Sequence, residues 1–201
     1  MHAPGRTEAF SDGVFAIAIT LLVLDLHVPD ARPDLLGALA AQWPHYAAYA
    51  VSFLTIGIIW VNHHGFVDRL QRVNRPLLFL NLLFLLFVSV LPFPTSLLSQ
   101  FLDGPQGPIA AAVYSANMAA MGVAFGAMVG YASRRRGLLA EGAAAALTRG
   151  YLVRFAFGSP VYVLAAAVAF VDTRISLALI AGLAVYYALL TPPGRGRGPG
   201  E

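Results

Sequence analysis

The carboxylates of Asp12 and Asp25 stand at the two ends of an apolar run, Gly13–Leu24. Its twelve residues would rise about 18 Å as a helix, well short of the roughly 30 Å hydrocarbon core of a bilayer. A carboxylate inside a membrane is costly and usually faces a bundle interior or a water-filled cavity. We therefore expect both side chains to meet protein or water, or to lie at the level of the lipid headgroups.

The adjacent histidines His63 and His64 raise the question of a metal site. Neighbouring residues of a helix point about 100° apart, so one ion cannot readily bind both rings. The HExxH pattern is missing, and so are Cys residues, a nucleophile elbow and paired carboxylates within an apolar segment. These observations predict that the protein is not an enzyme, binds no metal and needs no cofactor.

An aliphatic stripe follows one face of the same apolar run. At about 100° per residue, Ile17, Leu21 and Leu24 share one narrow sector, with Thr20 on its flank. Asp12 points to roughly the opposite side. Composition alone favours a stripe that faces lipid or neighbouring helices, and a surface that works on ions is the alternative.

The overall composition indicates a membrane protein. Hydrophobic residues make up 58 % of the 201 positions and charged residues only 11 %, against about 25 % charged in average domains. A small soluble domain cannot hide so many apolar side chains, and a disordered chain would not contain them. All 13 basic residues are Arg, which indicates a GC-rich genome and a bacterial source.

Six apolar segments, separated by Pro and Gly, are each long enough or nearly long enough to cross a bilayer. No small-x-small cleavage site follows the first, so we expect it to be a retained span and not a signal peptide. The sequence predicts an all-α integral membrane domain over residues 1–192 and a disordered Gly/Pro/Arg tail over 193–201. The predicted spans cover residues 7–28, 35–62, 76–101, 108–131, 151–171 and 175–190.

The positions of the arginines predict the orientation. With the N-terminus in the cytoplasm and six spans, only Arg32 and Arg174 lie outside and the other eleven lie inside, as the positive-inside rule requires. This predicts a multi-pass protein of the bacterial cell membrane with both termini cytoplasmic. The basic composition then needs no nucleic-acid partner, and contact between Arg134–Arg136 and anionic lipid is an option.

Several motifs together resemble one known family. The segment Arg6–Asp12, RTEAFSD, is similar to the RxxxFSD signature of the transmembrane protein 175 family, the lysosomal potassium channels and their bacterial homologues. The run from Ala16 to Asp25 resembles the rest of that family's first span. Further similarities, which bring the resemblance to about residues 6–98, are Trp60-Val-Asn62-His63-His64, Asn81 and Leu91-Pro92-Phe93.

The resemblance implies a homotetramer in a lipid bilayer, with four copies of the first span around a pore for potassium ions. It implies that Ile17 forms the narrowest ring, that Leu21 and Leu24 form further rings outward, and that Thr20 supplies a hydroxyl layer that favours potassium. It also implies a network that joins the first span to the second and third and serves assembly. The residues of this network are Arg6, Phe10, Ser11, Asp12, Trp60, Asn62, His63, His64 and Asn81.

Aliphatic rings in a narrow pore gate by dewetting. The chain has no TVGYG-like loop for a carbonyl filter, so the Thr20 hydroxyls are the candidate replacement ligands. Selectivity for potassium should therefore be weaker than in a channel with a carbonyl filter. A secondary transporter of a small cation or solute is the alternative function. It would need an ionisable or unwound site at mid-membrane, but Asp25 and Arg154, the charges nearest to span interiors, are both close to span ends.

Overall fold

The computed structural model describes residues 3–29, 34–102, 104–140, 142–143 and 157–189. Among these residues the secondary structure is helical apart from one isolated β-bridge between Leu70 and Leu139, in agreement with the predicted all-α class. The helices in chain order are α1 (Gly5–Leu21), η1 (Leu22–Asp25), α2 (Leu35–Ala41), α3 (Trp43–Val67), α4 (Arg75–Val90), α5 (Pro92–Phe101), α6 (Gly107–Arg134), α8 (Gly158–Val168) and α9 (Thr173–Leu189).

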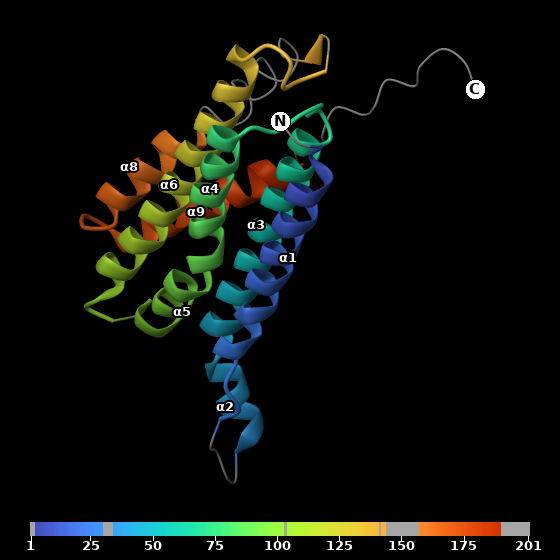
Figure 1. Cartoon of the computed structure of the whole chain (residues 1–201). Helices are drawn as coiled ribbons and strands as arrows, with labels where there is room; N and C mark the ends of the chain where they lie inside the picture. Colours follow the sequence, from blue (N-terminus) through green and yellow to red (C-terminus); the bar gives the residue numbers. More distant parts are fainter. Residues whose placement is uncertain (1–2, 30–33, 103, 141, 144–156, 190–201) are drawn as a thin grey trace.

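The long helices run roughly along one axis of the molecule (Figure 1). Helix α1 and the single 3-10 turn η1 descend from the N-terminal end, and α3 returns beside them. Helix α1 also packs against α4, whereas α6 packs against α4, α5 and α8. The N-terminal helix therefore has neighbours on one side only within the chain.

Four described segments are long and apolar enough to cross a membrane: Gly5–Asp25, Trp43–Val67, Arg75–Phe101 and Gly107–Arg134. Helices α8 and α9 are apolar but shorter. The start of the predicted fifth span, residues 151–156, and the predicted tail at 193–201 lie outside the described residues. A count of six spans thus remains a prediction.

Several helix boundaries differ from the ends of the predicted spans. The first helical segment ends at Asp25 and not at residue 28, because Leu26 takes an extended backbone conformation. The predicted span 35–62 is interrupted at Gln42 between α2 and α3, and α3 continues to Val67. Helix α6 also continues beyond the predicted end, to Arg134.

The predicted span 76–101 is interrupted at Leu91. Pro92 has no N–H, and a proline within a helix removes a backbone hydrogen bond. The Leu91 N–H bonds to the Val88 carbonyl, three residues back, which leaves the Phe87 carbonyl without its usual donor. The side chain of Asn117 on α6 donates to that carbonyl over 3.1 Å, so α6 compensates for the break in its neighbour.

The connections at one end of the bundle are paired through their backbones. The Gln71 N–H donates to the Leu138 carbonyl at 2.8 Å, and the Ala140 N–H donates to the Arg69 carbonyl at 3.1 Å. Gly137 has a positive φ of 81°, a left-handed conformation that glycine adopts without strain. These bonds fix the α3–α4 loop against the segment that follows α6.

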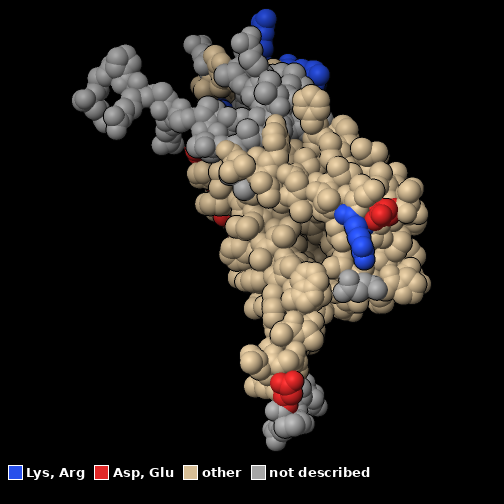
Figure 2. Space-filling model, turned by 180° about the vertical axis from the view of Figure 1, so that it is seen from behind, with Lys and Arg blue, Asp and Glu red and all other residues tan. Residues whose placement is uncertain are grey.

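Arginines gather at this same end of the molecule. Arg6 lies at the start of α1, Arg69 and Arg72 follow α3, and Arg75 begins α4, while Arg134–Arg136 end and follow α6. Figure 2 shows basic side chains at the top of the molecule and one further basic side chain lower down, beside an acidic one. We call the arginine-rich end the inner end and the opposite end the outer end.

Candidate functional site

Helix α1 has one buried face and one exposed face. Ser11, Phe15, Ala18 and Leu22 are buried against α3 and α4. On the other face Ile17 is 61 % exposed, Leu21 42 % and Leu24 70 %. The predicted stripe therefore lies on the surface of the single chain, whereas the core of the subunit is formed by the opposite face of the same helix.

Thr20 lies on the exposed face of α1, directly before Leu21 and three residues after Ile17. Its hydroxyl donates to its own helix, 2.9 Å from the Ala16 carbonyl and 3.0 Å from the Ile17 carbonyl. A hydroxyl has one proton and two acceptor lone pairs. Because the proton is directed to the backbone, the oxygen of Thr20 presents its lone pairs outward, where they can accept from water or contact a cation.

A chain of directed hydrogen bonds joins the buried face of α1 to α3 and α4. The Ser11 hydroxyl donates to the Thr7 carbonyl (2.8 Å), and the Asn81 amide N–H donates to the Ser11 oxygen (3.0 Å). The Asn81 carbonyl oxygen is 2.8 Å from Nε2 of His63, so that nitrogen must be the donor. This places the neutral-ring proton of His63 on Nε2.

His63 is only 1 % exposed. Its ring stacks on Phe84 with centroids 5.4 Å apart and an interplanar angle of 4°. The centroid of the Phe15 ring also lies 5.4 Å from that of His63, in a tilted arrangement. Nδ1 of His63 is buried without a hydrogen-bond partner among the described residues. Its environment suits a structural histidine and not an ion ligand.

Asp12 makes a second link between the same helices. The indole Nε1–H of Trp60 on α3 donates to Oδ1 of Asp12 at 2.8 Å. The Trp60 ring is also stacked on His64, with centroids 5.7 Å apart. Asp12 and Trp60 lie at the surface of the chain, unlike the buried Ser11 and Asn81.

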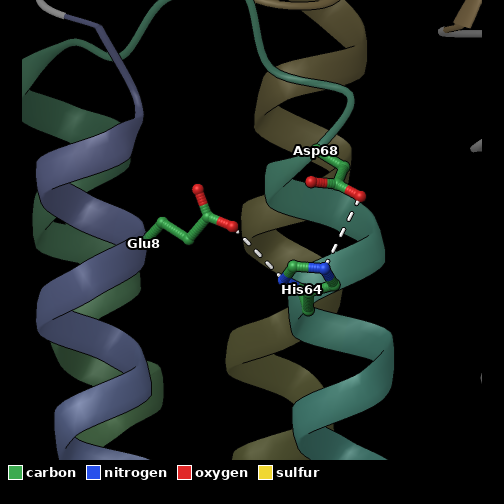
Figure 3. Close-up of side chains that lie close together, drawn as sticks. All are labelled: Glu8, His64 and Asp68. Atoms are coloured by element: carbon green, nitrogen blue, oxygen red, sulfur yellow. Dashed lines mark ion pairs between the residues drawn. The ribbon is translucent and has the colours of Figure 1, made fainter.

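His64 bridges two carboxylates near the inner end. Figure 3 shows its ring between Glu8 of α1 and Asp68, the residue that follows α3. Nδ1 lies 3.3 Å from Glu8 Oε1, and Nε2 lies 3.7 Å from Asp68 Oδ2. When the imidazole is protonated, the two ion pairs connect the start of α1 to the end of α3.

The same three side chains could hold a metal ion, since one ligand atom of each lies within 4.8 Å of the others. The two ring nitrogens face different carboxylates, however, so an ion on one nitrogen would displace one of the two ion pairs. The prediction of no metal rested on the pair His63-His64 and missed the i, i+4 pair of His64 and Asp68, the residue that caps α3. The absence of a metal remains a prediction.

The carboxylate of Asp25 is held by hydrogen bonds at the outer end. It accepts hydrogen bonds from Ser96 (2.5 Å) and Ser99 (2.6 Å) of α5, and Nδ1 of His45 on α3 lies 3.4 Å from it. Hydroxyl groups on a helix of modest hydrophobicity carry no signal that they serve a carboxylate 71 and 74 positions away. The sequence prediction therefore missed Ser96, Ser99 and His45 as partners of Asp25.

Three predicted network residues lie apart from these bonds. Arg6 is exposed and Phe10 is 55 % exposed, both on the outside of the chain. Asn62 donates to the Ile58 carbonyl of its own helix at 2.7 Å and lines an apolar cavity between α3, α6, α8 and α9. Among the described residues, hydrogen bonds therefore join Ser11 to Asn81 and His63, and Asp12 to Trp60. Arg6, Phe10 and Asn62 take no part in these bonds.

Comparisons with known proteins cover most of this chain. The family model described as endosomal/lysosomal potassium channel TMEM175 matches residues 6–92, which include α1, α3 and α4. A potassium channel of Streptomyces collinus is 48 % identical over 196 residues, covering 96 % of this chain and 95 % of that protein. A potassium channel of Chamaesiphon minutus is 38 % identical over 189 residues, covering 92 % and 93 %.

The fold agrees as well. The crystal structure of a lysosomal potassium-selective channel TMEM175 homologue from Chamaesiphon minutus superposes with a TM-score of 0.82 at 38 % identity, over 92 % of this chain and 96 % of that one. These matched proteins are named as channels and not as enzymes, which confirms the prediction that the protein is not an enzyme. By its sequence and by its fold, the chain belongs to the TMEM175 family.

Proposed function

We propose that the protein is a potassium-permeable cation channel of a bacterial membrane, with a pore lined by α1. The observation that carries this proposal is the exposed face of α1, where the described residues leave Ile17, Leu21 and Leu24 between 42 % and 70 % exposed. The opposite face of the helix is fully used by the subunit core. The names of the full-length relatives, both potassium channels, support the same conclusion.

One copy of α1 cannot enclose a pore, so the channel requires several subunits. We propose a homotetramer in which four exposed stripes meet on a common axis. Arg6 and Phe10, exposed on α1, then lie where an adjacent subunit can contact them. In this assembly the network residues hold helices and subunits together and do not bind the permeant ion.

The aliphatic rings form the gate. A narrow pore lined by Ile17, Leu21 and Leu24 gives an ion no ligands in exchange for its hydration shell, so water leaves the constriction and conduction stops. Opening requires these side chains to move apart or turn aside. No cofactor takes part in this mechanism, because the width and the hydration of the constriction alone control conduction.

Thr20 supplies the oxygen ligands of the pore. Its lone pairs face outward from α1 because its proton is bound by the helix backbone. Gly13–Leu24 contains no charged residue that could concentrate cations at mid-membrane. Selectivity from four hydroxyls should therefore favour potassium over sodium more weakly than a filter built from rings of carbonyls.

The test is potassium flux into liposomes that contain the purified protein. Ile17→Asn should hydrate the constriction and raise the resting flux, because a polar ring retains water. Val23→Asn is the matched control: Val23 is also exposed on the same segment, but at about 100° per residue it points roughly 120° away from Ile17. Equal flux in wild type and Ile17→Asn would contradict the assignment of Ile17 to the gate.

The same liposomes separate a channel from a secondary transporter. A channel passes current whose reversal potential follows the potassium gradient and whose rate does not saturate at low concentration. Saturating flux that depends on a second, coupled solute would contradict the channel proposal as a whole.

A further inference from the structure

A hollow opens on the surface between the inner parts of α4 and α6. Its lining consists of Leu80 on α4 and Ala127, Tyr131, Arg134 and Arg135 on or just beyond α6. Leu80 and Ala127 form an apolar wall, and the two guanidinium groups form the rim toward the inner end. The hollow thus has a cationic end and an apolar end along the direction of the helices.

Both arginines are folded back onto α6. The guanidinium carbon of Arg135 lies 5.6 Å from the centroid of the Tyr131 ring, and Nη1 of Arg134 donates to the Gly130 carbonyl at 3.1 Å. Each guanidinium has five N–H donors in a planar fork that suits phosphate oxygens. These contacts use few of the donors, so both side chains are positioned over the hollow and can still donate to an anion.

The wall of the hollow is held in place by Asn74. Its side-chain N–H donates to the Tyr131 hydroxyl at 3.0 Å, and its side-chain oxygen accepts from the Leu77 N–H at 3.1 Å, capping α4. The bonds fasten the start of α4 to the last turns of α6. The start of α4 and the end of α6 therefore lie on the same side of the hollow as the two arginines.

We propose that this hollow binds the phosphate group of an anionic phospholipid, with Arg134 and Arg135 on the phosphate and an acyl chain along Leu80 and Ala127. Charge and shape argue for a lipid, because the cationic rim lies at the ends of two membrane-spanning segments and the apolar wall continues toward their middle. The proposal rests on the proposed membrane insertion of α4 and α6, and does not require ion conduction.

The test is native mass spectrometry of the purified protein in detergent, titrated with phosphatidylglycerol or phosphatidylcholine. We expect preferential retention of phosphatidylglycerol and a loss of roughly tenfold in its affinity for Arg134→Gln/Arg135→Gln. Arg72→Gln/Arg136→Gln removes the same charge from the same end but outside the hollow, so its loss should be much smaller. Equal losses in the two double variants, or no preference between the lipids in wild type, would overturn the site.

Two further experiments distinguish a lipid site from a general attraction for anions. Ala127→Trp keeps every arginine but fills the hollow, and should also weaken phosphatidylglycerol binding; unchanged binding would overturn the role of the apolar wall. Inorganic phosphate at millimolar concentration should fail to displace the lipid, whereas displacement would assign the site to a free anion. These binding measurements stand apart from the flux of the same protein, so failure of the lipid site and failure of the channel proposal are distinguishable.

Discussion

The hydrogen bonds from His63 to Asn81, from Asn81 to Ser11 and from Ser11 to Thr7 all run in one direction. Asn81 and Ser11 each accept from the side chain before them and donate to the next group, whereas His63 begins the chain as a donor and the Thr7 carbonyl ends it as an acceptor. A buried donor or acceptor that loses its partner costs about 1–3 kcal/mol. The amide of Asn81 is the only member that serves two other side chains, so it is the most sensitive point of this network.

Asn81→Ala should therefore lower the free energy of unfolding by about 1–3 kcal/mol, because it leaves the buried Nε2–H of His63 without an acceptor and removes the donor to the Ser11 oxygen. The measurement is thermal or denaturant unfolding of the protein in detergent. Asn117→Ala is the matched control, since Asn117 makes one bond to the Phe87 carbonyl at 3.1 Å. A smaller effect at Asn81 than at Asn117 would contradict the central role of the network.

Thr20 allows a test of selectivity at a single atom. Thr20→Ala removes the hydroxyl that presents its lone pairs to the exposed face, so the preference for potassium over sodium should fall severalfold. Thr20→Ser keeps the hydroxyl and should keep most of the preference. Reversal potentials under asymmetric potassium and sodium report the ratio, and an unchanged ratio in Thr20→Ala would assign selectivity to another layer.

At the scale of the elements, the face of α1 could be predicted from sequence because helical periodicity is a local property. The placement of Ile17, Leu21 and Leu24 together needed only the angle per residue. Which side of α1 lies buried could not be predicted in this way, since Phe15, Ala18 and Leu22 on the core side are equally apolar. The difference arises from α3 and α4, which pack on that side.

Contacts between distant polar residues could not be predicted for a related reason. Ser96 and Ser99 bond to Asp25 only because α5 is turned by the interruption at Leu91. The prolines in the sequence indicate such a break but not its direction. Likewise, the bond from Asn117 to Phe87 exists because the break leaves a carbonyl unpaired, which no pattern of side chains reveals.

The link between α1 and α3 carries a prediction about assembly. Asp12→Ala should weaken the oligomer, because it removes the acceptor of the Trp60 indole at the exposed surface of α1 and α3. Size-exclusion chromatography with light scattering should show a shift toward smaller species as the protein is diluted. Asp172→Asn is a control that neutralises a carboxylate whose printed bonds lie only at the start of α9. A stable oligomer with altered ion preference would place Asp12 in the conduction path.

At the scale of the whole molecule, the described arginines other than Arg174 lie at the inner end, where α1 and α4 begin and α3 and α6 end. This segregation follows from sequence alone once the spans are counted, since each span reverses direction. What the sequence left undetermined is how the inner loops are fastened, for the Leu70–Leu139 bridge pairs segments almost 70 positions apart.

The chain has no cysteine, so single cysteines can report its orientation. Val28→Cys, 90 % exposed at the outer end, should react with a membrane-impermeant maleimide in intact cells. Arg136→Cys at the inner end should react only after the membrane is permeabilised. The reverse pattern would contradict the proposed orientation, and labelling of both positions in intact cells would contradict the proposed number of crossings.

The attachments of α1 have a mechanical consequence. Asp12 and Ser11 hold it near one end and Asp25 near the other, while no side chain of Gly13–Leu24 hydrogen-bonds to another described helix. An elastic rod clamped at both ends deflects most at its midpoint and least at its supports. Midway between these clamps lie Ile17 and Thr20, where only the apolar packing of the opposite face holds the helix, so in the proposed pore bending of the helix would displace these two side chains most.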